Sequence, residues 1–318
     1  MKIPSLSRLF RRTSHPAGWC AVCINSSGVH VAQLKLGGGR PQVLKCAFHP
    51  ADQVTSESLE ALRKTTRITG VQFTTLLAPG EYQMLLVDAP NVPLEEMRTA
   101  IRWRIKDSLD FHVDDATIDV LRIPANKTAG ERPQMLYAIA APNSAIQKCV
   151  VLFEKAKMDL NVIEIPEMAQ RNIAALFEES GYGLALLAFD DNGGLLTFTS
   201  GGELYLARRI EITLPQLQDT NEVLRQQSQE RLELELQRSM DYFGRQHSYM
   251  AMGKLLVCAP QQLGLVPLLA ANLEVPVEQL DLAQVMDIGA APELAESAYA
   301  AQMFYTLGAA LRQERRAL

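Results

Sequence analysis

Hydrophobic and polar residues follow the pattern of short β-strands at two places along the chain. The apolar runs of the first place are 19–24, 29–36 and 42–47. Those of the second place are 184–189, 195–200 and 203–210. The short links between these runs are rich in Gly, Asn, Asp and Ser, which favour the tight turns of antiparallel hairpins. The sequence therefore predicts the same three-stranded unit twice, at the start of each of two halves.

The segment from 84 to 120 predicts a strand, a helix and a second strand. Apolar residues recur at three- and four-residue steps, so they share one helical face: Leu94, Met97, Ile101, Ile105 and Leu109. Basic residues occupy the other faces: Arg98, Arg102, Arg104 and Lys106. The second strand is expected at 116–123, a third at 134–141 and a helix at 144–158, so this region forms a predicted α+β insert.

The remaining periodic segments complete a two-half organisation. We expect helices at 56–67, 166–177 and 217–246, and strands at 71–77, 161–165 and 254–258. The predicted division is a basic leader at 1–14, a first subdomain at 15–89 with 161–180, an insert at 90–160 and a second half at 181–318.

Composition places the chain among globular proteins. Its 318 residues are 47% hydrophobic and 21% charged. No apolar run approaches the roughly 20 residues that a membrane-spanning helix needs. The basic start is not followed by the apolar region of a secretory signal. We therefore expect a cytoplasmic protein that does not cross the membrane.

Charge is unevenly distributed along the chain. Residues 1–51 carry a net charge of +7 and contain no Asp or Glu, so the remainder carries −12. An acidic body is not typical of nucleic-acid binding. Within residues 1–12, apolar side chains could share a face while the basic ones meet anionic lipid. A solubilising tail is the alternative interpretation of this leader.

The five cysteines do not form a disulfide framework or a metal site. Cys20 and Cys23 make a single C-x-x-C within an apolar strand pattern, and no second pair of ligands occurs elsewhere in the sequence. We therefore predict buried thiols and no metal.

Three segments match the sequence patterns of one known protein family. Its insert pattern is matched by Pro93, Glu95, Glu96, Ala100, Trp103, Phe111, Asp114, Asp115 and Asp119. The helix LELELQRSMDYF at 232–243 and the closing LGAALR at 307–312 match two further patterns. By these segments the chain resembles the PilM family of type IV pilus assembly proteins. Within the family, the sequence is most similar to components of mannose-sensitive haemagglutinin (MSHA) pilus systems. The resemblance implies an α/β actin-like ATPase fold of two related halves, with an α+β insert subdomain as in PilM and FtsA.

The resemblance also implies a nucleotide site, and this sequence departs from it. In the family's first phosphate turn, Cys23 stands in place of an acid, Asn25 in place of a glycine and His30 in place of a lysine. A thiol does not supply the hard oxygen ligands that magnesium prefers, and Asn25 restores a β-carbon where the backbone must approach phosphate. We therefore predict a degenerate site and no catalytic residues.

The family-like nucleotide contacts come from two turns and a helix. The candidate residues are Asn25, Ser26, Ser27, Gly28, Asp190, Gly193, Gly194, Glu235 and Arg238. An ordinary hairpin turn is the alternative interpretation of 190–194, and a solvated helix face that of Glu235 and Arg238. Two cofactor hypotheses stay open, namely no cofactor, or ATP with magnesium bound weakly. A cytoplasmic component of type II secretion with the same fold is a further alternative.

The resemblance finally implies a protein partner. In the family, a groove between the first subdomain and its insert accepts the cytoplasmic N-terminal tail of a PilN-like inner-membrane protein. Here the matching surface surrounds 71–77 and 84–121, with Trp103 and Arg104 as candidate contacts. We expect an adaptor associated with the inner membrane, a pseudo-ATPase rather than an enzyme, with the assembly ATPase of the pilus as a second partner.

Overall fold

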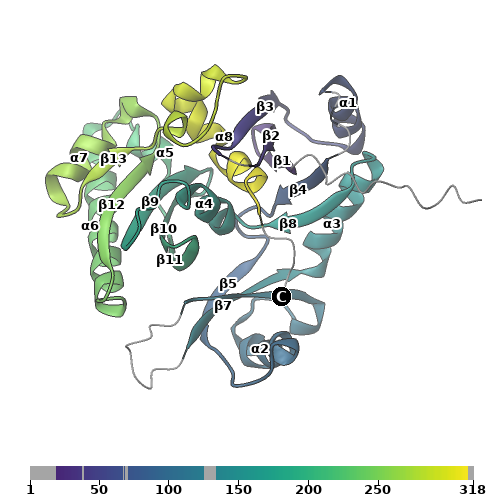
Figure 1. Ribbon diagram of the computed structural model, residues 1–318, viewed down its shortest axis with the longest axis horizontal. Helices are drawn as coiled ribbons and strands as arrows, with labels where there is room; N and C mark the ends of the chain where they lie inside the picture. The colour runs from purple at the N-terminus through teal and green to yellow at the C-terminus, as the bar shows by residue number, and fades with distance from the viewer. Residues whose placement is uncertain (1–18, 38, 67, 69–70, 125–133, 314–318) are drawn as a thin grey trace, which may run out of the picture.

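The computed structural model describes residues 19–37, 39–66, 68, 71–124 and 134–313. Two five-stranded sheets and one three-stranded sheet form its framework (Figure 1). The leader predicted at 1–14 lies outside the described residues. Among the described helices, none is long and apolar enough to span a bilayer.

The first sheet has the order β3-β2-β1-β4-β8. Its strands are β1 (Trp19–Asn25), β2 (Gly28–Lys35), β3 (Gln42–Pro50), β4 (Gln72–Leu76) and β8 (Leu160–Glu164). β1, β2 and β3 are an antiparallel meander, whereas β4 and β8 run parallel to β1. Helix α1 (Ser56–Thr66) connects β3 to β4 and buries Leu59.

The second sheet repeats this topology, with the order β11-β10-β9-β12-β13. Its strands are β9 (Tyr182–Asp190), β10 (Gly193–Ser200), β11 (Glu203–Ile210), β12 (Ala251–Cys258) and β13 (Val277–Gln279). The first three are again antiparallel, and β12 and β13 run parallel to β9. The predicted duplication is therefore present in the fold.

The two halves exchange their packing helices. Helix α4 (Pro166–Ala174) follows β8 of the first half but packs on β9, β10 and β11 of the second. The last helix, α8 (Ser297–Ala310), packs on β1, β2 and β4 of the first half. The side-chain amide of Gln170 on α4 donates to the carbonyl of Leu186 at 2.7 Å and to Thr197 Oγ1 at 2.9 Å. One apolar core therefore includes residues of both halves.

The insert is a three-stranded antiparallel sheet covered by a short helix. Its strands are β5 (Gln83–Asp88), β6 (Ala116–Arg122) and β7 (Met135–Pro142), in the order β5-β7-β6. Helix α2 (Met97–Ile105) lies between 3₁₀ turns at Leu94–Glu96 and Lys106–Ser108, so the helix is shorter than the predicted 94–109. A further 3₁₀ turn spans Val113–Asp115. Met97, Ile101 and Ile105 are buried against this sheet, as their spacing predicts.

The insert differs from the predicted 90–160 at both ends. β5 pairs with β7, so residues 83–88 belong to the insert sheet and not to the first subdomain. Helix α3 (Asn143–Lys155) buries Phe153 in a cluster with Cys20 and Val31 of the first sheet. α3 therefore joins the insert to the first half because its apolar side is shared with β1 and β2.

The long helix predicted at 217–246 begins later, as α6 (Glu222–Gln246), and Leu217 is instead the last residue of a short helix α5 (Leu214–Leu217). The later start occurs because Asn221 caps α6, its Oδ1 accepting the backbone N–H of Val223 at 3.0 Å. Beyond β12 lie α7 (Leu265–Asn272) and the 3₁₀ turns η5 (Gln261–Leu263), η6 (Leu282–Gln284) and η7 (Pro292–Ala295).

Candidate functional site

The first hairpin turn of each half faces the other across a cleft. The β1–β2 turn contains Ser26 and Ser27, and the β9–β10 turn contains Asp191 and Asn192. Ser26 Oγ donates a hydrogen bond to Asp191 Oδ2 at 2.6 Å. The two turns that would surround a phosphate group in the resembled family are therefore in direct contact.

The side chain of Asn25 occupies the donors of its own turn. Asn25 Oδ1 accepts the backbone N–H groups of Ser27 at 3.0 Å and Gly28 at 3.2 Å. It also accepts the hydroxyl of Ser27 at 2.8 Å. Backbone N–H groups in such a turn are the groups that hold phosphate in a glycine-rich loop. Here the side-chain oxygen of Asn25, and not a phosphate oxygen, accepts these hydrogen bonds.

Asp190 is held by the protein in a similar way. Its Oδ1 accepts the backbone N–H of Asn192 at 2.9 Å, and its Oδ2 pairs with the Arg209 guanidinium. Arg209 Nε also lies 3.7 Å from Glu167 Oε1. Burial on its own would lower the pKa of Arg209, but the neighbouring carboxylates of Glu167 and Asp190 raise it. The charge of Asp190 is therefore compensated within the fold.

This charge network extends to the start of the insert. The hydroxyl of Tyr82 donates to Glu167 Oε2 at 2.6 Å. Burial, and then the charge of Glu167, raise the pKa of Tyr82. Tyr82 directly precedes β5, Glu167 lies on α4 and Arg209 lies on β11. The network therefore connects the two halves beside the cleft.

A pocket of about 310 Å³ remains beneath the turns. Two of its polar lining atoms, His30 Nε2 and Tyr305 Oη, are buried and have no hydrogen-bond partner among the described residues. Burial lowers the pKa of His30 and raises that of Tyr305. Within the described residues, no Lys or Arg lines this pocket, whereas Asp190 and Asp191 do. A triphosphate would therefore meet acids and would find no described lysine or arginine lining the pocket.

The glycines of the two turns are required by the hairpins. A β-carbon at Gly28 would lie 2.2 Å from the carbonyl oxygen of His49, and one at Gly193 would lie 2.4 Å from that of Ile210. Both residues have positive φ, 145° and 130°. Gly28, Gly193 and Gly194 do not line the pocket. The structure thus gives these glycines a role in close strand contact.

Two other predicted nucleotide contacts lie elsewhere. Glu235 and Arg238 on α6 pair with each other at 3.2 Å, and their side chains are largely exposed. Neither lines the pocket. The i,i+3 spacing places both on a solvated helix face, which agrees with the alternative interpretation, and their contact with a nucleotide stays a prediction.

The cleft also contains residues that the motifs did not indicate. Gln302, Tyr305 and Thr306 of α8 line the pocket beside Cys23. Burial raises the pKa of Cys23 to about 12, which keeps a thiol rather than a thiolate there at neutral pH. The apolar pattern of 297–310 predicts a buried helix, but nothing in the pattern indicates which sheet it covers.

The predicted partner contacts lie on the insert. Trp103 on α2 is 69% exposed, with Lys106 Nζ 5.9 Å from its ring centroid. Arg104 donates to the carbonyl of Asp88 at 2.7 Å. A separate hollow of about 540 Å³ lies where α1 meets α3, and its lining includes Val54, Val151, Leu152, Lys148 and Lys155. Trp103 and Arg104 are not part of that hollow.

Comparison with known proteins establishes the fold class. No family model and no curated protein matches the sequence. Among solved structures, a chain of a PilM–PilN type IV pilus biogenesis complex is similar with a TM-score of 0.70 and 17% identity, covering 92% of this chain and 99% of that chain. A Bacteroides thetaiotaomicron protein with an actin-like ATPase fold and unknown function has a TM-score of 0.50 and 9% identity, with 86% and 93% covered.

A third similar structure is the cytoplasmic domain of EpsL, an inner-membrane component of the Vibrio cholerae type II secretion system. Its TM-score is 0.46 at 12% identity, with 83% of this chain and 85% of that chain covered. The chain has the actin-like ATPase fold, as the two repeated sheets and the similar solved structures establish.

Proposed function

We propose that this chain is an actin-like adaptor of a type IV pilus assembly machine, acting by binding protein and not by hydrolysing nucleotide. The observation that carries the proposal is the structural match to a chain of the PilM–PilN complex, which extends over 92% of this chain. The sequence patterns at 93–119, 232–243 and 307–312 point to the same family. A fold alone does not determine function, so the geometry of the site has to support the same role.

The state of the cleft supports an adaptor without a nucleotide cycle. Asn25 satisfies the turn's N–H groups, and Asp190 is paired with Arg209. Both groups would have to give up these partners before they could hold phosphate or a hydrated magnesium ion. Binding of ATP would therefore have to replace interactions that the fold already makes.

A nucleotide-gated adaptor is the second candidate, favoured by the pocket of about 310 Å³ beneath the turns. Calorimetric titration of the full chain with Mg-ATP, with ADP as the control, separates the two candidates. We expect no saturable heat up to millimolar nucleotide. A saturable signal would support the nucleotide-gated candidate and would make the Asp190 site the next to be mutated.

The partner in this proposal is the cytoplasmic tail of a PilN-like inner-membrane protein. The hollow between α1 and α3 suits a short peptide, because it combines apolar Val151 and Leu152 with polar and basic side chains at its rim. It also lies where the first half joins the insert, through α3. The exposed Trp103 is a second contact that a longer tail would cover.

A peptide titration tests the partner. A synthetic peptide with the tail sequence of the PilN-like protein from the same pilus system is expected to give a saturable binding isotherm. Val151→Glu, which places a charge in the hollow, should weaken binding at least tenfold. Val150→Glu is the matched control, because Val150 is exposed on the same helix and does not line the hollow. Equal affinities for the wild type and both variants would contradict this site.

The finer assignments follow the sequence resemblance. We propose an MSHA-type pilus, with this chain in the place of its PilM-like component MshI. The partner's membrane anchor would hold the chain at the inner face of the cytoplasmic membrane, and the pilus assembly ATPase would be a further partner. Co-purification with the PilN-like protein from membranes, lost in the Val151→Glu variant, checks this location.

A further inference from the structure

The pocket beneath the two turns combines apolar walls with a few polar groups. Its volume of about 310 Å³ is at the lower end of the range of ligand pockets. The apolar part of the lining comes from β1, the end of β4 with the residues after it, and the start of α4: Ile24, Leu76, Leu77, Ala78, Pro79 and Pro166. Walls of this kind exclude water and favour a ligand with an apolar body.

The buried histidine of this pocket offers a hydrogen-bond acceptor. His30 is 3% exposed, and its Nε2 atom has no hydrogen-bond partner among the described residues. Burial lowers the pKa of His30, and a hydrogen bond with the backbone of Cys23 opposes that effect in part. A backbone group that favours the protonated ring is a carbonyl that accepts its N–H. In the neutral ring the remaining nitrogen, Nε2, is therefore an acceptor.

The second acceptor, Asp191, carries a charge that no described cation compensates. Asp191 is exposed in the β9–β10 turn, and its Oδ2 accepts the hydroxyl of Ser26 at 2.6 Å. Among the residues that the structure describes, no basic side chain forms an ion pair with Asp191, whereas Asp190 is paired with Arg209. The charge of Asp191 raises the pKa of His30 against the larger effect of burial, so the two acceptors act on the same space.

Unpartnered polar atoms in this pocket indicate a polar ligand. Folded proteins leave few buried polar atoms without a partner, so such atoms in a pocket mark a place for a bound polar group or for water. His30 Nε2 and Tyr305 Oη are two atoms of this kind. Because no described Lys or Arg lines the pocket, a ligand that compensates Asp191 must bring the positive charge itself.

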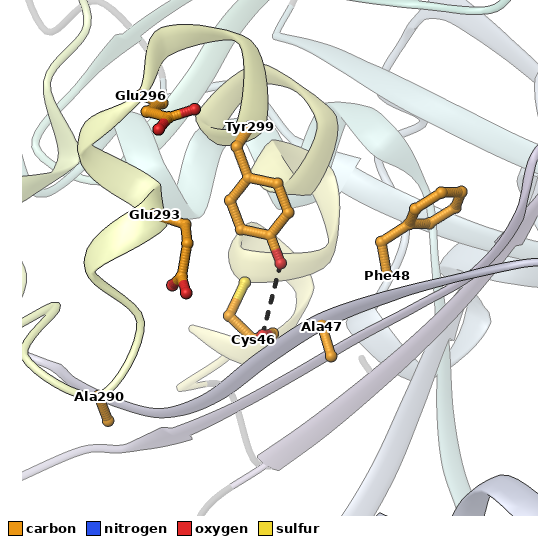
Figure 2. Close-up of a pocket in the computed structure, with 7 residues that line it drawn as sticks. All are labelled: Cys46, Ala47, Phe48, Ala290, Glu293, Glu296 and Tyr299. Carbon is orange, nitrogen blue, oxygen red and sulfur yellow. Dashed lines mark hydrogen bonds between the residues drawn. The ribbon is translucent and has the colours of Figure 1, made fainter.

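A second acidic hollow of the molecule lacks these features. It has a volume of about 410 Å³ and lies between β3 and the segment 290–299, with Glu293 and Glu296 on one side (Figure 2). We call it the β3 hollow. Both acids are exposed, and Tyr299 Oη donates to the carbonyl oxygen of Cys46 at 3.5 Å. Among the described residues that line the β3 hollow, no buried side-chain polar atom lacks a partner. Negative charge alone therefore does not distinguish the cleft pocket, whereas the buried acceptor and the apolar walls do.

We propose that the cleft pocket binds a small organic cation, an amidinium or guanidinium group carried on an apolar body, in place of a nucleotide. The N–H groups of such a cation donate to His30 Nε2 and to the Asp191 carboxylate. The apolar body lies against the walls around Leu76 and Pro79. A planar cation with several N–H donors suits this set of acceptors better than a point-like ammonium group. This inference goes beyond the proposed adaptor function and does not rest on it.

Calorimetric titration of the full chain with three probes of one shape tests the proposal. Benzamidine is a planar cation on an apolar ring, benzamide is its neutral counterpart and benzoate is the anion. We expect saturable binding of benzamidine, with an affinity roughly tenfold higher than that of benzamide, because its hydrogen bonds are charge-assisted. Benzoate should give no saturable heat. Absence of benzamidine binding, or equal affinities for benzamidine and benzamide, would overturn the proposal.

Two variants locate the site. Asp191→Asn keeps an oxygen for Ser26 and removes the charge, so benzamidine should bind roughly tenfold more weakly and lose its advantage over benzamide. His30→Phe keeps a ring and removes the acceptor, so both probes should bind more weakly. Asp191 is exposed in a turn, and its replacement leaves the core unchanged.

A matched control removes one acid from the β3 hollow. Glu293→Gln makes the same change in net charge as Asp191→Asn and should bind benzamidine as the wild type does. Equal losses in Glu293→Gln and Asp191→Asn would overturn the proposal, because the cation would then respond only to overall charge. The titrations with Mg-ATP and with the tail peptide test the adaptor function separately, so failure of benzamidine binding leaves their outcome unaffected.

Discussion

A β-carbon at position 308 of α8 would stand 2.2 Å from the carbonyl oxygen of Ala169 on α4, so Gly308 and Ala169 bring the two helices together backbone to backbone. The contact is reinforced by Asn172 Nδ2, which donates to the carbonyl of Gly308 at 3.0 Å. Each of these helices covers the sheet of the other half. The close approach of α4 and α8 therefore requires a glycine at position 308.

Gly308→Ala should lower the free energy of unfolding by roughly 2–3 kcal/mol, because the added methyl group forces apart two packed helices. Chemical denaturation measures the effect. Gly244→Ala on α6 is the control, since a β-carbon there meets nothing within 4 Å. That change should raise the free energy of unfolding by roughly 0.5–1 kcal/mol. Equal stability of Gly308→Ala and wild type would show that α8 can shift away from α4.

Arg312→Ala should destabilise the fold by roughly 3–5 kcal/mol, because it removes a cation that pairs with a buried carboxylate. Arg312 pairs with Glu164, whose side chain is 2% exposed. The control is Arg238→Ala, which breaks an exposed pair on α6 and should change stability by less than about 1 kcal/mol. Urea unfolding of both variants provides the comparison, and similar losses for the two would contradict this difference.

Stability should fall as the pH falls below about 6.5, and His30 should account for part of the loss. Burial lowers the pKa of His30 in the folded state, so the unfolded state binds more protons as pH drops through the ordinary histidine range. The loss begins at the unfolded pKa and continues down to the folded one. Its slope is at most about 1.4 kcal/mol per pH unit for one proton.

His30→Gln should make the free energy of unfolding less dependent on pH between 7 and 5. The change His112→Gln is the control, because it removes one histidine at an exposed position of the insert and leaves the cleft intact. His247, whose pKa burial also lowers, remains in both variants and preserves part of the slope. An unchanged slope in His30→Gln would assign the whole effect to other groups.

Asn25→Gly restores the glycine of the resembled phosphate turn and should still not restore ATP binding. The change frees the N–H groups of Ser27 and Gly28 and should reduce stability by roughly 1 kcal/mol. Asp190 keeps its pairing with Arg209, so the second turn remains unsuited to phosphate. Calorimetry with Mg-ATP checks the outcome. Saturable binding by this variant would show that Asn25 alone blocks the site.

The repeated strand units could be predicted from sequence because their signals are local. The third strand of the second unit was expected at 203–210 and is β11, Glu203–Ile210. Period-two alternation and turn residues within a few positions are enough to place such strands. The observed boundaries differ from the predicted ones where a single side chain caps an element, as Asn221 does at the start of α6.

The helix exchange and the state of the cleft could not be predicted in this way. The apolar face of 297–310 indicates burial. Its contact with β1, however, is made between elements that lie near opposite ends of the sequence. In the same way, Asn25 and Asp190 were identified by comparison with a motif, whereas their partners became known only from the fold. Glu235 and Arg238 matched the motif and still lie outside the pocket, because a family position does not fix a side chain's surroundings.

The exchanged helices also constrain how the chain is made. Ribosomes add roughly 5–20 residues per second, so α8 is completed roughly 15–55 s after β2 has left the peptidyl transferase centre. During this time the side of β1 and β2 that α8 covers has no partner from its own chain. The nascent first half must therefore wait for the last helix before its sheet is covered, and truncation before Ser297 would leave that surface open to chaperones and proteases.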